Sequence, residues 1–412
     1  MLHSRSLLRR RPLGGRPFQL LLASLAVSSC GDWVYNVALL ALVFERTHSG
    51  TWLALTTAAR VLPIVLLGPL GGVMADRHDR RRLMIGADLA RVALMVALAA
   101  VAAAGLPIVL APAIAAAATA AGTAVPPCVA ASTARLVPGP DLQRANARRA
   151  AVGQAAIVAG PALGALVLVV STPATAILLN ALTFIASAVA VWSIGSGPAF
   201  VPAVTAGETA CGVLDGIMAG ARALRGAPAA IRLIAADMVC SAVYGTLTVL
   251  FVLLGRQLGA GTGAYGLLMG AYGIGGVIGA MAIGRVANPA RWRTALIAAL
   301  LLVATTLVTL GSGPTLLEAL VASLLGGGGL VVGEVLADTA LPQMLDDDIL
   351  ASAYGLAVPV SLGGIVVGSL LAGPLVSFLG VGGALTTVGL AVMVACWAVV
   401  RRPLAVAVPS VA

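Results

Sequence analysis

Three charged side chains lie inside long apolar stretches of the chain, where a charge needs a chemical or a structural purpose. Asp32, Arg60 and Asp237 are flanked along the sequence by aliphatic and small residues. Ionisable groups at membrane depth are costly, so they are functional candidates by default. A carboxylate whose surroundings change can bind and release a proton, because burial favours its neutral form. We therefore expect Asp32 to be the first candidate for proton coupling and Asp237 the second.

Arg60 offers a different interpretation of Asp32. Counted from the outer ends of the predicted helices, Asp32 lies about 12 residues deep and Arg60 about 8, an axial difference of roughly 6 Å. An arginine side chain spans that distance, so Asp32 and Arg60 could equally form a structural ion pair. Asp88 and Arg91, one helical turn apart, are expected to support the basic loop that precedes them.

That basic loop carries the most specific spacing in the chain. Within residues 71–82 stand Gly72, Asp76, Arg77, Arg80 and Arg81. A glycine permits close approach of two helices. An aspartate at a helix end can accept hydrogen bonds from a neighbouring helix N-terminus and pair with arginine. The spacing favours a charged contact between helices, and a plain positive loop at a membrane face is the alternative.

A second motif joins two glycines to a proline, as Gly160, Pro161 and Gly164. Proline removes a helix hydrogen bond and glycine permits bending, so such a helix can pack tightly and still flex. A simple packing kink is an equally open interpretation. Glycines at helical spacing within residues 266–279 predict another close helix contact.

The elements that carry these residues are predicted to be membrane helices. The 412-residue chain is 60 % hydrophobic and 10 % charged, whereas a soluble protein is nearer a quarter charged. Its basic side chains are all arginines in short clusters, which argues against nucleic-acid binding despite a net charge of +10. A membrane helix needs roughly 20 apolar residues, and twelve stretches of the chain reach that length. They are 18–44, 52–75, 83–105, 108–134, 145–170, 174–195, 229–254, 264–286, 293–311, 315–338, 350–378 and 381–400.

The arginines give these spans an orientation. Only Arg46 and Arg256 occupy one set of connections, and the opposite set holds the remaining clusters. Loops rich in arginine stay in the cytoplasm. We therefore expect both termini to be cytoplasmic.

A weak internal repeat divides the chain in two. Residues 157–160 resemble residues 365–368, and Gly71 aligns with Gly279 at the same offset of 208 residues. A shared offset favours two six-helix pseudo-repeats of an all-α membrane protein. The predicted parts are an N-terminal half (1–195), a cytoplasmic linker (196–228) and a C-terminal half (229–412).

The basic loop resembles the signature loop of the major facilitator superfamily, between its second and third spans. The resemblance places Gly72, Asp76, Arg77, Arg80 and Arg81 at the signature positions, with Asp79 where the family usually has glycine. It implies that the loop latches the two halves together when the protein faces outward. The motif at residues 160–164 is similar to the helix-five motif of exporters in this superfamily. Shorter stretches, among them residues 30–33, 58–63 and 144–147, resemble the bacterial macrolide-efflux and enterobactin-exporter branch.

These resemblances imply a secondary transporter in a bacterial cell membrane. The expected function is proton-driven efflux of a small amphipathic or hydrophobic compound by alternating access. Its partners would be that substrate, the proton gradient and the lipid bilayer, with no cofactor and no metal, and we expect a monomer. An uptake or facilitative carrier is the alternative within the fold. A non-transporting membrane protein or an intramembrane enzyme is the alternative from another class.

Overall fold

The apolar stretches form helices throughout the part of the chain that the computed structural model describes. That part comprises residues 15–137, 139–201, 228–259, 264–283, 291–344 and 347–401. The helices are α1 (Gly15–Thr47), α2 (Gly50–Arg77), α3 (Arg80–Ala103), α4 (Leu110–Gly122), α5 (Val125–Leu136), α6 (Gly139–Val170), α7 (Pro173–Ser193), α9 (Pro228–Gln257), α10 (Ala264–Ile283), α11 (Trp292–Gly311), α12 (Leu316–Met344) and α13 (Asp347–Arg401).

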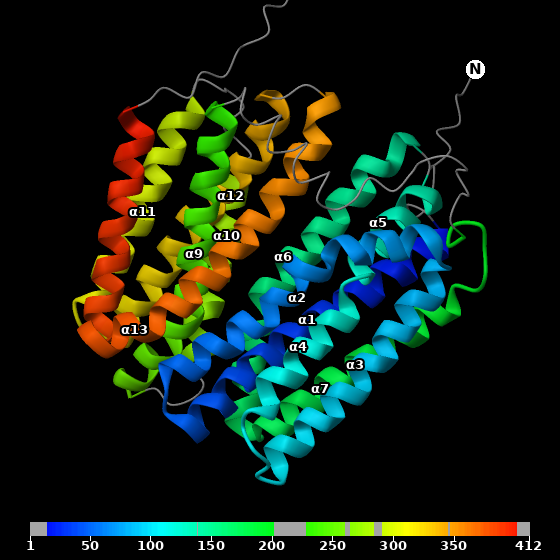
Figure 1. The fold of residues 1–412 in the computed structure, drawn as a ribbon, viewed down its shortest axis with the longest axis horizontal. Helices are drawn as coiled ribbons and strands as arrows, with labels where there is room; N and C mark the ends of the chain where they lie inside the picture. Colours follow the sequence, from blue (N-terminus) through cyan, green and yellow to red (C-terminus); the bar gives the residue numbers. More distant parts are fainter. Residues whose placement is uncertain are drawn as a thin grey trace, which may run out of the picture.

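The helices form two bundles, which follow the order of the chain. Helices α1 to α7 make the N-terminal bundle and α9 to α13 the C-terminal bundle (Figure 1). Contacts between the bundles run from α2 to α13 and from α6 to α10. The bundles meet near the bottom of the view, and their helices diverge toward the top (Figure 1).

Prolines and glycines account for two differences between the predicted and observed helices. The predicted span 108–134 is divided into α4 and α5, because Pro126 and Pro127 at the start of α5 cannot donate helix hydrogen bonds. Near the C-terminus, the predicted break between 350–378 and 381–400 falls at Gly380. Its φ of 70° and ψ of 176° interrupt α13 in a conformation that glycine tolerates.

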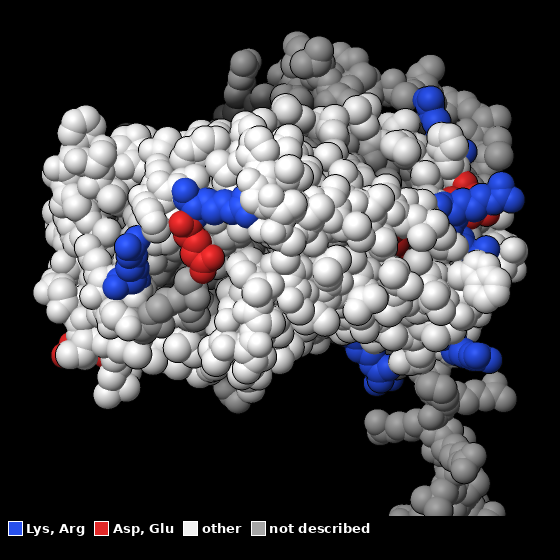
Figure 2. Space-filling model, turned by 90° about the horizontal axis from the view of Figure 1, so that it is seen from below, with Lys and Arg blue, Asp and Glu red and all other residues white. Residues whose placement is uncertain are grey.

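Eleven helical stretches within the described residues are long and apolar enough to cross a membrane. The number differs from the twelve expected because the last stretch, Pro359–Trp397, counts as one although Gly380 interrupts it. Large apolar side chains cover the outside, as at Phe378, which is 86 % exposed. Charged side chains on the face seen in Figure 2 gather in a few places around a broad uncharged centre. Such a surface suits a lipid environment.

Small residues bring the helices of the C-terminal bundle close together. A Cβ at Gly275 would meet the backbone of Leu324, and one at Gly279 would meet the backbone of Gly328. These contacts join α10 to α12 and confirm the close packing predicted for residues 266–279. The predicted linker lies largely outside the described residues, which omit 202–227. At its start, the Phe200 carbonyl accepts a hydrogen bond from the Arg80 backbone, so this part belongs to the N-terminal bundle.

Candidate functional site

A polar cluster around Arg60 lies where the two bundles face each other. The Arg60 guanidinium, on α2, donates a hydrogen bond to the side-chain oxygen of Asn36 on α1. It also stands 5.2 Å from the centre of the Tyr35 ring. Tyr244 and Tyr265, which belong to the C-terminal bundle, lie within electrostatic range of Arg60. A cation at membrane depth therefore faces the opposite bundle.

Aromatic side chains form the C-terminal side of this region. The Tyr244 and Tyr272 rings are 6.1 Å apart, and Phe251 packs edge-on to Tyr272 at 6.5 Å. The hydroxyls of Tyr35, Tyr265 and Tyr272 are buried, and none reaches a described group with full hydrogen-bond geometry; Arg60 is the polar neighbour of Tyr35, and Asn36 is that of Tyr265. Buried hydroxyls normally find partners. These groups are therefore available to a ligand between the bundles.

A charged triad of Asp32, Arg91 and Asp88 lies within the N-terminal bundle. The Arg91 guanidinium donates to Asp88 and stands 3.9 Å from Asp32. Arg91 also covers the Phe184 ring at 4.0 Å, and Asn180 donates to Asp32 over 3.4 Å. The Asp88 side chain is 3 % exposed and the Asp32 side chain 43 %. Asp32 is thus the member of the triad that an approaching proton can reach.

This triad corrects two expectations from the sequence. In this conformation the ion-pair partner of Asp32 is Arg91, and the nearest polar contact of Arg60 is Asn36. Arg91 and Asp88 do not serve the basic loop; they belong to the triad instead. The reason is that α7 packs against both α1 and α3, which directs Arg91 across Phe184 toward Asp32.

Two further carboxylates lie in the C-terminal bundle. The Ser361 hydroxyl of α13 donates to Asp237 of α9, so this candidate is held by a neutral partner. Glu334 of α12, which sequence reasoning missed, lies within electrostatic range of Tyr244 and Tyr272. The signal was present, because Glu334 is an acidic residue within the predicted span 315–338.

The signature loop is anchored to its own bundle. Arg81 donates to the carbonyls of Trp192 and Val191 at the end of α7, over 2.6 and 3.3 Å. Arg80 is buried, donates to the Ala75 carbonyl and lies 3.8 Å from Asp76, whose side chain is 77 % exposed. In this conformation Asp76 is therefore free to meet another partner.

The turn and the glycines of the loop also differ in detail from the expectation. Asp79 accepts a hydrogen bond from the Arg82 backbone over 2.9 Å and caps α3, so the aspartate replaces the usual glycine with a helix cap. The close helix approach expected at Gly72 is made by Gly71 instead. A Cβ at Gly71 would come within 2.6 Å of the Thr123 carbonyl, whereas a Cβ at Gly72 meets no atom of the described chain within 4 Å. Arg77 ends α2.

The glycine–proline motif packs α6 between the two bundles. A Cβ at Gly164 would lie 3.0 Å from Val37, and one at Gly160 would collide with Trp33, both on α1. On the other side, a Cβ at Gly266 of α10 would lie 2.7 Å from the Pro161 carbonyl. The motif therefore sits at the boundary that must move if the bundles move.

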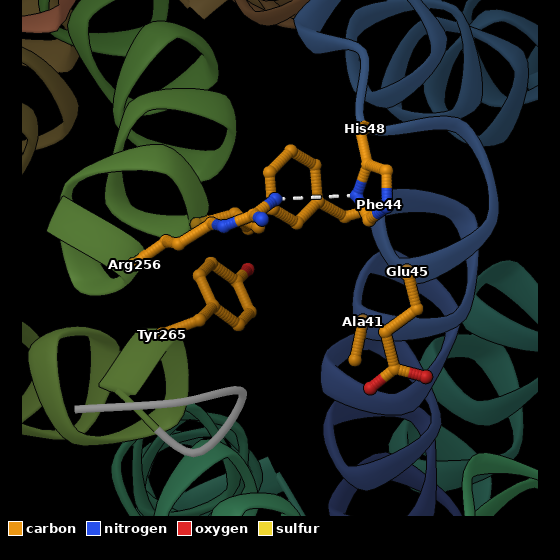
Figure 3. A pocket seen from close by; sticks show the side chains of 7 residues that line it. Ala41, Phe44, Glu45, His48, Arg256 and Tyr265 are labelled. Carbon is orange, nitrogen blue, oxygen red and sulfur yellow. Dashed lines mark hydrogen bonds between the residues drawn. The ribbon is translucent and has the colours of Figure 1, made fainter. Parts of the chain in front are cut away.

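A pocket of about 200 Å³ lies between the bundles near their arginine-poor ends. Its walls include Phe44 of α1 and His48 just after α1, together with Arg256 of α9 and Tyr265 of α10 (Figure 3). An Arg256 N–H donates to Nδ1 of His48 over 3.2 Å, and the guanidinium lies 5.5 Å from the Phe44 ring centre. Arg256 thus joins the two bundles beside the pocket.

Comparison with known families decides the class of the protein. Residues 10–409 match the transmembrane secretion effector family of the major facilitator superfamily. The chain belongs to this family of transporters. The superfamily predicted from the signature loop is confirmed, and because its members are transporters, the intramembrane-enzyme alternative is wrong.

Curated relatives match this transporter over a short stretch. Over 72 residues, which make up 17 % of each chain, it is 38 % identical to the uncharacterized MFS-type transporter YfiS of Bacillus subtilis. The same identity over 72 residues, 18 % of each chain, relates it to macrolide efflux protein A of Streptococcus pyogenes. The chain thus aligns with less than a fifth of these relatives, and the resemblance to macrolide-efflux proteins is confirmed as a distant one.

Solved structures share the fold of this transporter. A point mutant of the nucleoside transporter NupG superposes with a TM-score of 0.78 over 93 % of this chain and 99 % of its own, at 11 % identity. A POT family transporter in complex with a thioalcohol-conjugated peptide gives 0.76 over 94 % and 96 %, also at 11 % identity. At such low identity the likeness establishes the fold alone.

Proposed function

We propose that this transporter exports a small amphipathic or hydrophobic compound by alternating access, driven by proton entry. The observation that carries the proposal is the match to the transmembrane secretion effector family over residues 10–409. The distant likeness to a macrolide efflux protein supports the outward direction. An uptake or facilitative carrier of the same fold is the competing function.

The proposed topology has twelve spans in two six-helix halves, with α13 counted as two spans on either side of Gly380. The arginine-rich loops, both termini and the linker are placed in the cytoplasm. With this proposed topology, contacts such as Arg256 to His48 would close the outer end, and the described conformation would be the inward-facing one. In the outward-facing state, Asp76 would leave solvent and latch the signature loop to the other half.

Asp32 is our proposed coupling group because its triad holds one cation for two carboxylates. Arg91 balances one negative charge, and a proton on Asp32 would balance the other. Asp32 is the accessible carboxylate, and α1 packs against the motif helix α6 at the boundary between the halves. Proton binding would therefore change the charge next to the moving boundary.

We predict that Asp32→Asn abolishes substrate efflux against a gradient but permits downhill exchange of bound substrate. The amide oxygen of the variant can accept the hydrogen bond from Asn180, but the amide cannot bind and release the proton. The measurement is uphill and downhill transport in proteoliposomes, with Glu334→Gln and Asp237→Asn as matched carboxylate controls.

A purely structural triad gives a different result. Asp32→Asn would then lower the amount of folded protein, and Arg91→Gln in the same chain would restore part of it. Full uphill transport by Asp32→Asn would remove Asp32 as the proton carrier. Loss of uphill transport only in Glu334→Gln would assign the proton to α12.

The direction of transport is tested by substrate accumulation. An efflux-deficient bacterial host that produces the protein should retain less of an exported compound than the same host with the Asp32→Asn variant. Candidate compounds are amphipathic drugs and metabolites. Higher accumulation in cells with the intact protein would favour uptake and contradict the proposal.

A further inference from the structure

The two arginines at membrane depth in the N-terminal bundle differ in how their charge is balanced. Arg91 has two carboxylates as partners, Asp88 and Asp32. Arg60 has no carboxylate of the described chain within 4.0 Å, and its Nε is buried without a hydrogen-bond partner. A half-buried cation at membrane depth without a paired counter-charge is unfavourable. Such a group is kept where a charge of opposite sign is supplied at some stage of the protein's function.

The side chains in contact with Arg60 are an amide and an aromatic ring rather than acids. Tyr35 offers its ring face and Asn36 accepts one guanidinium hydrogen bond, which leaves other N–H groups available. Across the boundary, Tyr244 and Tyr265 lie within electrostatic reach of Arg60. The Tyr265 hydroxyl has the Asn36 side chain as its polar neighbour but makes no hydrogen bond of full geometry with a described group, and the residue is only 4 % exposed. Guanidinium and phenol groups together can donate to the two oxygens of an acid.

Asp32 does not supply this missing charge in the described conformation. It lies close enough to interact electrostatically with Arg60, but its ion pair is with Arg91. The interior of the N-terminal bundle holds two carboxylates and two guanidinium groups, so its net charge is zero. Both carboxylates are paired with Arg91, however, and Arg60 lies apart from them. Protonation of Asp32, as proposed for coupling, would leave Arg60 with still less compensation. A ligand anion at Arg60 would restore the balance.

We propose that Arg60 is the recognition residue for an acidic group on the substrate, so that the exported compound is an aromatic or amphipathic organic acid. The anion binds the guanidinium with help from the tyrosine hydroxyls, and the rings of Tyr244 and Tyr272 contact the apolar body of the compound. This inference names the substrate class of the proposed exporter and rests on that function for its biological meaning. Binding itself does not depend on the direction or coupling of transport.

The test compares matched acids and amides for binding to the purified full-length protein in lipid nanodiscs. The probes are benzoate, 2-naphthoate and indole-3-acetate, each with its primary amide, which keeps the ring and removes the charge. We expect the intact protein to bind at least one acid about tenfold or more tightly than its amide, since a hydrogen bond to a charged group contributes about 1.5–3 kcal/mol.

Variants then locate the preference. Arg60→Gln should lose the preference for the acid and retain binding of the amide, which also shows that the variant is folded. Arg60→Lys keeps the charge and should retain part of the preference. Arg46→Gln is the matched control, because Arg46 binds only the Leu106 and Ala102 carbonyls among its described contacts, and it should bind the acids as the intact protein does.

Equal binding of acids and amides, tighter binding of amides, or no binding of any acid at millimolar concentration overturns the proposal. So does an acid preference that survives in Arg60→Gln. An acid that binds through Arg60 but is not exported from cells would leave the recognition site intact and contradict the proposed function instead. Export of a compound whose binding does not depend on Arg60 would support the proposed function and contradict the recognition site.

Discussion

Replacing Arg91 by leucine is expected to destabilise the folded protein by about 3–5 kcal/mol, because it leaves two carboxylates near one another without their cation. The free-energy cost is largest at Asp88, since its side chain is only 3 % exposed and water cannot solvate its charge. The contact between the guanidinium and the Phe184 ring is lost as well. The measurement is the free energy of unfolding in detergent micelles, together with the amount of protein recovered from membranes.

A second substitution separates the charge from the packing. Asp88→Asn in the Arg91→Leu chain removes the buried negative charge and should recover at least half of the loss. Arg82→Leu is the matched control, because Arg82 is exposed and its side chain takes no part in the triad, and it should change stability by less than about 0.5 kcal/mol. Equal stability of Arg91→Leu and the intact protein would show that the triad contributes nothing to folding.

Helices and their breaks could be predicted from the sequence because they depend on local chemistry. Apolar length predicts a span, and Gly380 predicts the interruption of α13, since each signal lies in one short stretch. The prolines in the first turn of α5 also indicate its division from α4 in the sequence, but the uninterrupted apolar stretch around them favoured a single predicted helix.

The partners of the membrane charges could not be predicted, because they depend on which helix faces which. Asp32 and Arg60 are close in axial depth, but depth does not fix rotation about the helix axis. The contact of α7 with both α1 and α3 turns Arg91 toward Asp32 instead. Glu334 was missed for another reason. It is an acidic residue within a predicted span, and only its position near Tyr244 and Tyr272 in the structure distinguishes it from other acidic residues.

The contact between His48 and Arg256 joins positions that the predicted repeat makes equivalent. The two residues are 208 apart in the chain, which is the offset of that predicted repeat, and they lie at matching ends of α1 and α9. Residues near an axis of pseudo-symmetry would meet their own counterparts, which makes this pair a natural closure of the arginine-poor end. His48 has a φ of 49°, the one positive value among the described residues other than glycine. Such a conformation is kept when the surrounding contacts require it.

Arg256→Ala is expected to shift the protein toward a conformation that is open at the arginine-poor end. It removes one hydrogen bond and one cation–π contact between the bundles, together about 1–2.5 kcal/mol, which corresponds to a roughly 5- to 70-fold change in the population ratio. Spin labels at positions 49 and 257, in a background with the native cysteines replaced, report this opening as a longer distance.

Arg46→Ala provides the matched control for the loss of an arginine at the arginine-poor end. Arg46 lies on the same end but donates to the Ala102 and Leu106 carbonyls of its own bundle, so its removal should leave the label distance unchanged. An unchanged distance in Arg256→Ala as well would mean that the bundles are held by their apolar contacts alone.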